Sequence, residues 1–559
     1  MKMKNLSTRK RVVFLGLFIS ILLFALTIRL AHIQIILGKT YSKKALEQRT
    51  LPIAIHKVRG DILDRNKIPL TRRQQGDFLL IFPRFFDNNN PLLDTICKMT
   101  EVNNERMVQI LSQNKSFVEY EIINPNEEVE RQIKQGEYPG LMILRKNKRY
   151  DDTSIARHLV GYLREYDHSP QSGIEKEYDK YLHSDDVVMV DAIIDAQNRL
   201  LPGTTYSLQK SPQPHYNVQL TIDYYIQKIL EDVLDRHIER AGGVIVDVQT
   251  GEILALASRP NFDQNNVYQA LKDKDSLWSV PMKAFPPGSL FKTVVAAVGI
   301  EQGLYTGETP YTCNGKISIN GITYKCNPSI QSLGEINIRQ AFAHSCNDLF
   351  INIAQQVGGQ ATIDMANKLG LGQSLDIGLD NDPGNLPTKS QYSGAGIGNL
   401  ALGQDKVETS PLQIAQMMTI IANDGIKKEL SLVKAIIDQS GKVLKNFNYI
   451  QYEHEQVISY NTAKELKTWM MDVTEYGTGK KAFSKRVGGS AGKTGTPQIT
   501  GDDDAKYYGW FAGFFPLVDP KYVTVILVRQ ESEGGDKAAK IFKEIADEII
   551  IHTENIVLP

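Results

Sequence analysis

The residues with the clearest potential for chemistry are Ser289 and Lys292, which follow two prolines and a glycine and precede an apolar run over 294–300. The prolines and the glycine interrupt regular structure, so we expect a helix to begin at Ser289 with Lys292 one turn later on the same face. A serine hydroxyl is a weak nucleophile that needs a neighbouring base. A lysine amine can be that base when burial or a nearby cation lowers its pKa. The pair therefore indicates acyl transfer, and the helix N-terminus favours the developing negative charge.

Ser-x-x-Lys is a common pattern and indicates little by itself. The same spacing begins at five other serines, namely Ser7, Ser112, Ser207, Ser431 and Ser490. Of the six, Ser289 alone combines the spacing with the proline–glycine break and the apolar run. The interpretation of Ser289 as a nucleophile therefore depends on other residues further along the chain.

Two polar clusters supply such residues. Ser345 and Asn347 are two positions apart, where a hydroxyl can relay a proton and an amide can hold a carbonyl group. Lys493-Thr494-Gly495 occurs once; the lysine can bind a carboxylate, and a glycine in a strand allows a ligand to approach closely. Each cluster also has a plain alternative, because Ser-x-Asn begins at three other serines and the lysine cluster can be a surface turn.

The elements that must position these residues indicate an α+β body, an antiparallel sheet flanked by helices. Strands are predicted at 218–223, 243–248, 252–258, 508–515 and 522–528. Helices are predicted at 224–239 and 538–551, and the middle of the region is mostly helical to about residue 480. Because strands occur at both ends, we expect the first and last strands in one sheet. Lys493 is expected at an edge of this sheet, lining a cleft with little packing around it.

The N-terminus predicts a membrane anchor. Its basic residues precede every acidic one: Lys2, Lys4, Arg9, Lys10 and Arg11. Residues 12–28 carry no charge, and seventeen helical residues span ~26 Å, which an extension to residue 37 lengthens to the full membrane core. We therefore predict a cytoplasmic tail over 1–11, a single transmembrane helix over 12–37, and an extracytoplasmic remainder. A cleaved signal peptide is the alternative.

Length and composition indicate a folded, multi-domain chain. It has 559 residues, 42% of them hydrophobic and 23% charged, with a formal net charge of +0. This balance gives no indication of a nucleic-acid partner. We predict an elongated pedestal over 38–215, ending in a linker over 201–215, and a second domain over 216–559. His158 has no nucleophile pattern near it, so a structural role is favoured over a catalytic one.

Four cysteines are present, and two of them, Cys313 and Cys326, bracket a predicted hairpin with Asn320-Gly321 at its turn. Outside the membrane these two could form a disulfide, or they could remain unpaired thiols. Neither interpretation is preferred. The cysteine and histidine spacings do not indicate a zinc site, so we expect no metal and no cofactor.

The ordered set Ser-x-x-Lys, Ser-x-Asn and Lys-Thr-Gly resembles that of the serine penicillin-recognising enzymes. Residues 59–65, which read Arg-Gly-Asp-Ile-Leu-Asp-Arg, and residues 157–162 and 173–175 resemble segments of the pedestal, or dimerisation domain, of class B penicillin-binding proteins. Residues 220–223 and 509–514 resemble segments of the transpeptidase domain. The resemblance extends from the anchor to the C-terminal helix and implies a β-lactamase/transpeptidase-like domain on a pedestal with one transmembrane helix.

The resemblance also implies catalytic roles. Ser289 attacks the penultimate D-Ala carbonyl of a muropeptide stem, and Lys292 takes the serine proton. Ser345 passes a proton to the leaving amine while Lys493 tunes it. Asn347 holds the substrate amide.

Substrate binding is implied for the residues around the Lys-Thr-Gly motif. Thr494 and Thr496 bind the terminal carboxylate together with Lys493, and Gly495 lies between them. The backbone N–H groups of Ser289 and Thr496 form the expected oxyanion hole.

The implied function is a peptidoglycan D,D-transpeptidase that cross-links stem peptides and is inhibited by β-lactams. A D,D-carboxypeptidase is the nearest alternative, and a membrane-anchored β-lactam sensor or scaffold is a more distant one. The implied partners are stem peptides, penicillin and other β-lactams, the membrane, and a membrane glycan polymerase of the shape, elongation, division and sporulation type. The polymerase is implied because no glycosyltransferase domain precedes the pedestal.

Overall fold

The computed structural model describes residues 3–86, 90–112, 116–164, 168–195, 200, 206–208, 216–238, 240–273, 275–326, 332–447, 455–498, 507–530 and 535–557. The chain divides into two compact units. Unit 1 comprises 1–58, 75–147 and 185–213, and unit 2 comprises 59–74, 148–184 and 214–559. The predicted linker over 201–215 lies outside the described residues except for 206–208.

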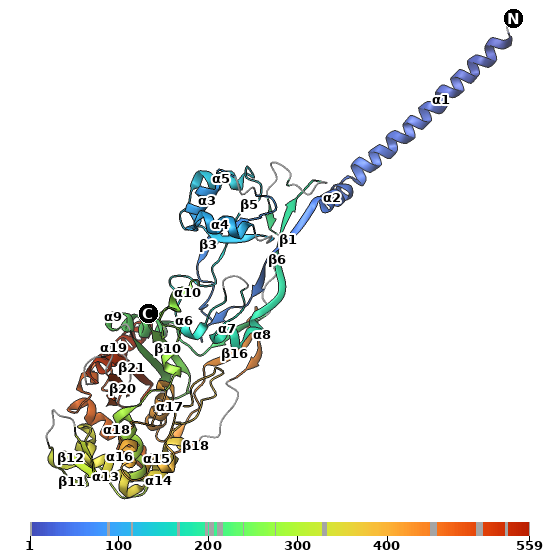
Figure 1. The fold of residues 1–559 in the computed structure, drawn as a ribbon. Coiled ribbons are helices and arrows are strands. Elements are labelled where there is room, and N and C mark those ends of the chain that lie inside the picture. The colour runs from blue at the N-terminus through green and yellow to red at the C-terminus, as the bar shows by residue number, and fades with distance from the viewer. Residues whose placement is uncertain are drawn as a thin grey trace. The chain divides into compact units, whose positions relative to one another are not determined.

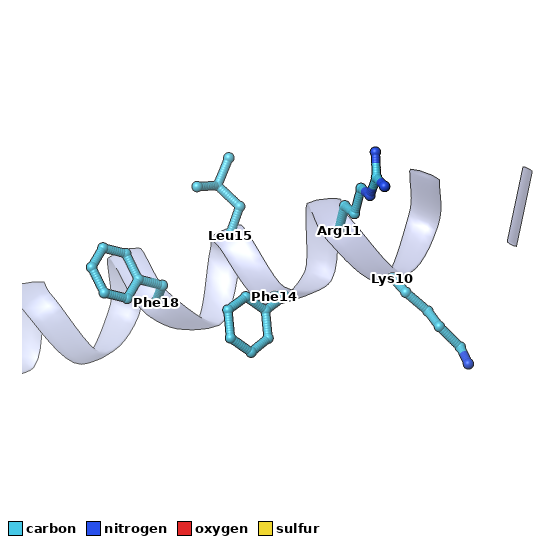
Figure 2. A pocket seen from close by; sticks show the side chains of 5 residues that line it. All are labelled: Lys10, Arg11, Phe14, Leu15 and Phe18. Carbon is cyan, nitrogen blue, oxygen red and sulfur yellow. The ribbon is translucent and has the colours of Figure 1, made fainter. Parts of the chain in front are cut away.

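Unit 1 begins with one long apolar helix, α1 (Met3–Ala31), which continues through π-helical turns (His32–Ile36) into α2 (Gly38–Arg49) (Figure 1). The stretch Thr8–Ile36 has 29 residues, its most apolar 18-residue window has a mean hydropathy of 2.5, and it is long and apolar enough to cross a membrane. Its side chains are exposed rather than packed in a core. A shallow hollow along the start of this helix is lined by Lys10, Arg11, Phe14, Leu15 and Phe18 (Figure 2).

The described residues in the rest of unit 1 form two small sheets and three helices. The first sheet has the order β1-β6-β7, from β1 (Thr50–Arg59), β6 (His183–Ile193) and β7 (Ser207–Leu208). The second has the order β4-β3-β5, from β3 (Gln75–Ile81), β4 (Val118–Glu121) and β5 (Leu141–Asn147). The helices are α3 (Leu93–Thr100), α4 (Asn104–Leu111) and α5 (Glu127–Lys134). Leu79 and Ile81 enter one core and Leu80 another, because successive side chains of β3 point to opposite faces.

Unit 2 is built on a five-stranded antiparallel sheet with the order β10-β9-β21-β20-β19. Its strands are β9 (Ala241–Asp247), β10 (Ile253–Arg259), β19 (Ala491–Gly495), β20 (Tyr507–Phe515) and β21 (Tyr522–Gln530). The predicted 249–251 hairpin and the two predicted C-terminal strands are therefore confirmed in one sheet. Since β19 is the end strand of the order, the predicted edge position of Lys493 is also confirmed.

Helices cover both faces of this sheet, which confirms the predicted α+β class. On one face α9 (Tyr224–His237) packs with α19 (Asp536–Val557), and on the other α17 (Pro411–Ala422) and α18 (Tyr460–Glu475) contact the strands. The strand sequences dictate the two faces. Trp510 and Phe514 enter the core on the α17 side, whereas Phe511 enters the core on the α19 side, as the two-residue period of a strand requires.

Further helices complete unit 2. They are α6 (Arg157–Val160), α7 (Gly173–Glu177), α8 (Asp179–Leu182), α10 (Val267–Ala270), α11 (Lys292–Glu301), α12 (Ile338–Ala343), α13 (Asn347–Val357), α14 (Gly359–Lys368), α15 (Lys389–Tyr392) and α16 (Gly396–Leu402). Every residue of α11 except its last is buried, which matches the apolar run over 294–300.

One prediction about the strands was wrong. The first predicted strand, β8 (Tyr216–Leu220), does not join the five-stranded sheet but lies in a second sheet of order β17-β16-β8-β2. Its other strands are β2 (Ile62–Leu63), β16 (Val433–Asp438) and β17 (Val443–Asn446). The predicted helical middle also contains short strands: β11 (Pro310–Cys313), β12 (Lys316–Ile319), β13 (Ile322–Lys325), β14 (Gly334–Asn337), β15 (Ile426–Lys427) and β18 (Glu455–Gln456). The β12–β13 hairpin around Asn320-Gly321 was predicted and is confirmed.

A buried ion network joins the sequence segments 59–65 and 173–175. The Glu175 side chain is fully buried and accepts from Arg59 Nε at 2.7 Å, from Arg149 Nε at 2.8 Å and from the Tyr150 hydroxyl at 2.8 Å. Although burial opposes the charge, the two guanidinium groups lower the pKa of Glu175 below its ordinary value. Arg149 also donates to the Gly60 carbonyl at 2.6 Å, so the network also holds the backbone of the 59–65 segment.

We expect Glu175→Gln to destabilise unit 2 strongly, because two buried guanidinium groups lose the carboxylate that they share, and only Arg59 keeps another one, Asp179. Breaking one side of such a buried pair costs about 3–5 kcal/mol. For a unit of this size that corresponds to a fall in melting temperature of roughly 5 °C. Thermal unfolding in detergent measures it, with Glu128→Gln as the control, since the Glu128–Arg131 pair is exposed. Equal melting temperatures for both variants would contradict the assignment.

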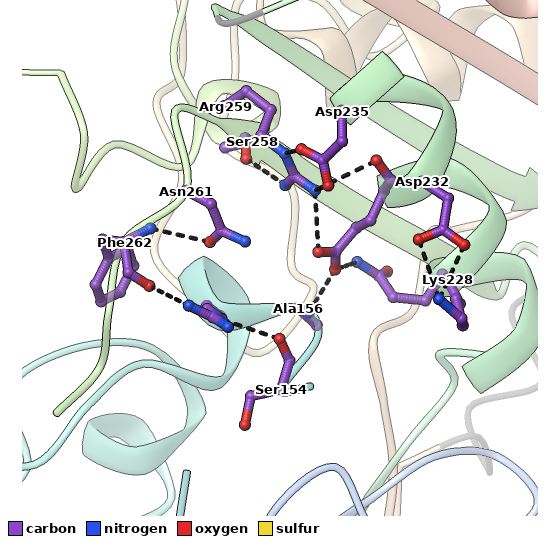
Figure 3. Close-up of polar contacts among 12 residues, drawn as sticks. Ser154, Ala156, Lys228, Asp232, Asp235, Ser258, Arg259, Asn261 and Phe262 are labelled. Carbon is purple, nitrogen blue, oxygen red and sulfur yellow. Dashed lines mark hydrogen bonds and ion pairs between the residues drawn. The ribbon is translucent and has the colours of Figure 1, made fainter. Parts of the chain in front are cut away.

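A second polar network connects α9 with the residues before α6 (Figure 3). Glu231 accepts from the Ala156 N–H at 2.6 Å and from Gln227 Nε2 at 2.8 Å, and Arg259 Nη2 lies 3.2 Å from its other oxygen. His158 lies close by, with Nε2 2.9 Å from the Ser276 carbonyl, and burial lowers the pKa of His158 to about 4. These contacts support the structural role that the sequence predicts for His158.

Candidate active site

The turn that carries Ser289 is held by backbone contacts. Residues Gly288–Phe291 form a 3₁₀ turn, η3, which leads directly into α11. Gly288 has a φ of 57°, and its N–H donates to the Gly403 carbonyl at 2.9 Å. Trp510 Nε1 on β20 donates to the Pro286 carbonyl at 3.0 Å. The proline–glycine break therefore places a half-buried Ser289 just before a buried helix, next to the sheet.

Lys292 is the first residue of α11, and its side chain is fully buried. Its Nζ donates to the Ser345 carbonyl at 2.7 Å, to Asn347 Oδ1 at 2.6 Å and to Ser345 Oγ at 3.1 Å. These three acceptors match the three protons of an ammonium group. Two of them are carbonyl oxygens that can only accept, whereas the Ser345 hydroxyl can also donate. A neutral amine can therefore keep both carbonyl bonds and direct its lone pair to a hydroxyl.

Burial changes the protonation of Lys292. Loss of hydration lowers the pKa of Lys292 to about 8, although nearby Cys346 and Cys326 act in the opposite direction. A lysine that acts as a base needs a pKa lowered by its surroundings, and burial gives Lys292 such a pKa. Near neutral pH a substantial fraction of such an amine is neutral and can accept a proton.

Ser345 and Asn347 are held at the start of α13. Ser345 has a φ of 56°, a left-handed conformation that a non-glycine residue rarely adopts. Cys346 is the N-cap residue of the helix, and its backbone dihedral angles lie in the β region. Asn347 Nδ2 donates to the Lys325 carbonyl at 2.7 Å, which turns its Oδ1 towards Lys292. The strained turn thus presents a hydroxyl, a carbonyl and an amide oxygen to one amine.

Lys493 lies on the edge strand β19, but the prediction of a lightly packed, cleft-lining side chain was wrong. Its side chain is fully buried, with Nζ 5.6 Å from the centre of the Phe342 ring and 3.3 Å from the Thr494 carbonyl. Burial lowers the pKa of Lys493 well below its ordinary value, and the positive charge of Lys292 adds to that effect. The two lysines are therefore close enough to influence each other's protonation.

The residues around Lys493 approach the Ser289 turn. A side-chain carbon at Gly495 would lie 2.5 Å from the Pro287 carbonyl oxygen, so the close approach allowed by this glycine is made by the protein's own backbone. The Thr494 hydroxyl lies 2.7 Å from the Thr478 hydroxyl. Thr496 follows β19 directly and is half-buried. The Lys493–Thr496 segment thus lies against the turn that carries Ser289.

Sequence reasoning missed several contacts in this region. Thr478 pairs with Thr494, and the Lys325 carbonyl orients Asn347. The rings of Phe342 and Phe350 lie near Nζ of Lys493 and Lys292, at 5.6 and 5.9 Å from their centres. The two phenylalanines flank Ser345 and Asn347 in the chain, so the sequence did contain a signal that aromatic rings lie near the two lysines. Nothing in the sequence pairs Thr478 or Lys325 with the motifs.

The structure joins most, but not all, of the predicted site residues by direct contact. Lys292, Ser345 and Asn347 are hydrogen-bonded, and Lys493 is coupled to Lys292 by charge. Within the described part of the chain, no hydrogen bond links the Ser289 hydroxyl to Lys292. A catalytic hydrogen bond often tightens only when substrate binds, so this does not disqualify the pair. A serine beside a buried amine and a hydroxyl relay can carry out acyl transfer.

Two family descriptions match the sequence. The penicillin binding protein transpeptidase domain matches residues 241–547, more than half of the chain, and the penicillin-binding protein dimerisation domain matches residues 54–220. Stage V sporulation protein D of Bacillus subtilis is 26% identical, covering 98% of this chain and 86% of that protein. Peptidoglycan D,D-transpeptidase MrdA of Escherichia coli is 24% identical, covering 99% and 95%.

A solved structure has the same fold. It is described as showing structural coordination of polymerization and crosslinking by a peptidoglycan synthase complex, and it matches with a TM-score of 0.69 at 23% identity, over 96% of this chain and 97% of that one. The sheet, the buried lysine and the motif order define a serine acyltransferase of the penicillin-recognising type. With a dimerisation domain preceding the transpeptidase domain, the chain belongs to the class B penicillin-binding proteins. Its activity is that of a serine-type peptidoglycan D,D-transpeptidase.

Proposed function

We propose that Ser289 is the nucleophile of this transpeptidase and that Lys292 is its general base. The observation that carries the proposal is the buried Lys292 amine, bonded to Ser345 and Asn347 and lowered in pKa. Ser289 Oγ attacks the penultimate D-Ala carbonyl, and its proton moves to Lys292. The peptide C–N bond then breaks, with the proton delivered through Ser345 to the leaving D-Ala amine. The product is an ester on Ser289.

The second half of the reaction reverses these roles. An amine from a neighbouring stem attacks the ester carbon, the ester C–O bond breaks, and a proton returns to Ser289 Oγ. Thr494 and Thr496 bind the terminal carboxylate, with Gly495 between them, and the buried Lys493 amine lies 3.3 Å from the Thr494 carbonyl. The N–H groups of Ser289 and Thr496 stabilise the oxyanion. β-Lactams acylate the same serine, and the stem peptide of peptidoglycan is the physiological substrate.

The test is a product assay with the full-length protein in detergent. A donor stem ending in D-Ala-D-Ala is incubated with and without a second stem that carries a free amine. We expect a cross-linked product and one released D-Ala per bond only when the amine is present, and neither product with Ser289→Ala. Release of D-Ala without a cross-link, with or without the amine, would instead identify a D,D-carboxypeptidase.

We further propose that residues 1–11 are cytoplasmic and that the chain after the anchor is extracytoplasmic, because the basic residues precede Val12. The domains we propose are a tail over 1–11, an anchor over 12–37, a pedestal over 38–215 and a transpeptidase domain over 216–559. An alkaline phosphatase reporter fused after residue 45 should be active in cells. An inactive phosphatase, with the fusion protected from protease in spheroplasts, would reverse the orientation.

A membrane glycan polymerase is the proposed partner. The related synthase complex couples polymerization with crosslinking, and the anchor helix of this chain exposes apolar side chains along its length. A polymerase in the same membrane could use that surface. Co-purification from detergent with and without residues 12–60 tests it, and equal recovery of a polymerase in both cases would remove the support.

A further inference from the structure

Three cysteines meet beside the candidate active site. Cys313 ends β11, Cys326 follows β13, and Cys346 caps α13 between Ser345 and Asn347. All three side chains are buried, at 1%, 7% and 2% exposure. Their spacings of 13 and 20 residues did not indicate a metal site in the sequence. The fold brings them together because the β12–β13 hairpin returns the chain to the start of α13.

The geometry of the three sulfur atoms fits one tetrahedral ion better than a disulfide. The Sγ–Sγ distances are 3.2 Å for Cys313–Cys346, 3.8 Å for Cys326–Cys346 and 4.0 Å for Cys313–Cys326. Thiolates bound to tetrahedral zinc at about 2.3 Å lie about 3.8 Å apart. A disulfide, at about 2.05 Å, joins two sulfurs and leaves the third as a buried thiol. All three sulfur atoms lie within 4.8 Å of one another, so one ion can reach each of them.

The surroundings of the cluster favour thiolates. The Leu349 N–H, in the first turn of α13, donates to Cys346 Sγ at 3.4 Å. The N–H groups of Asn347 and Asp348, at the start of the same helix, favour the anionic form of Cys326. These donors belong to an eleven-residue helix whose N-terminus favours negative charge. Backbone donors of this kind stabilise the anionic sulfur that a metal requires.

We propose that Cys313, Cys326 and Cys346 bind one zinc ion through their thiolates, with a water molecule completing the tetrahedron. Zinc is the commonest ion for a tetrahedral thiolate set, and three thiols each lose a proton when it binds. The cysteines act as positioning residues. Cys346 separates Ser345 from Asn347, and Cys326 follows Lys325, whose carbonyl orients the Asn347 amide. The ion therefore fixes the loop that holds the Lys292 amine.

The experiment measures metal content in the tag-free, full-length protein, purified in detergent without chelators. We expect about one zinc ion per chain by mass spectrometry, lost in Cys313→Ser and in Cys326→Ser. Cys97→Ser is the matched control, because Cys97 is also buried but lies in unit 1. Replacement of the zinc by Co²⁺ should give thiolate-to-cobalt charge-transfer absorption in the wild type and not in Cys326→Ser. This optical signature reports ligation even if a variant is less stable.

Two further readouts complete the test. Loss of zinc should slow acylation by penicillin by roughly 10- to 100-fold, because small misplacements of catalytic groups have effects of that size. Ser289→Ala should keep its zinc, so a failure of the catalytic assignment is distinguishable from a failure of this one. A metal-free protein with three titratable thiols in the cluster would overturn the proposal. So would an intact mass two hydrogens lower, with a disulfide mapped between any two of the three.

Discussion

Replacing Ser289 by alanine is expected to abolish covalent labelling by a fluorescent penicillin. Alanine has no oxygen with which to open the β-lactam ring, so no ester can form at any concentration or time. The fold should be preserved, because the side chain is half-buried and a change that creates no cavity or unpaired polar group usually alters stability by less than about 0.5 kcal/mol. The measurement is in-gel fluorescence together with the melting temperature.

Ser431→Ala is the matched control for this experiment. Ser431 begins another Ser-x-x-Lys match, with Lys434 at its end, and it lies outside the site. Penicillin labelling should be unchanged in this variant. Labelling of Ser289→Ala at the normal rate, or its loss in Ser431→Ala with unchanged stability, would show that the wrong match had been chosen.

The sequence predicted the supporting frame of this site well. The 249–251 hairpin, the C-terminal strands and the helices after residues 224 and 538 follow from local patterns, which strand periodicity and turn residues determine directly. The location of β8 was not predictable in this way. Its alternating side chains suit any half-buried sheet, and only long-range pairing with β16 and β2 decides which one it joins.

The motifs of the site were predictable from the sequence, but the burial and packing around them were not. The order of Ser289, Ser345 and Lys493 was visible in the sequence, yet the complete burial of Lys493 was not. Burial depends on Phe342 and the strands around β19, which come from separate parts of the chain. The three-cysteine cluster was missed for the same reason, because its spacing is set by a hairpin and a helix start rather than by a local motif.

Acylation by penicillin is expected to rise with pH and to level off above a midpoint near pH 8, because the proposed base is the neutral amine of Lys292. Burial lowers the pKa of Lys292 to about 8, so raising the pH through that value populates the form that accepts the serine proton. Lys292→Ala should lose this step and slow acylation by about 10²- to 10⁴-fold, the usual contribution of a general base. Lys434→Ala is the control and should keep the wild-type profile.

The same titration predicts the pH dependence of stability. The pKa of Lys292 falls from 10.5 in the unfolded chain to about 8 in the fold, so between these values the unfolded chain binds more protons. Stability should therefore increase as the pH rises from about 8 to 10.5. The total gain is about 3 kcal/mol for a fully buried group, since one pKa unit corresponds to about 1.4 kcal/mol.

Lys292→Met removes the charge while keeping most of the side-chain volume, so its melting temperature should rise less than that of the wild type over that pH range. The rise that remains is the contribution of Lys493, whose pKa burial also lowers. Lys434→Ala should retain the rise, because the change leaves Lys292 in place. A wild-type acylation midpoint above pH 10, or identical stability profiles for wild type and Lys292→Met, would show that the buried amine stays charged. Lys292 would then act as an electrostatic group, and the proton of Ser289 would need another acceptor.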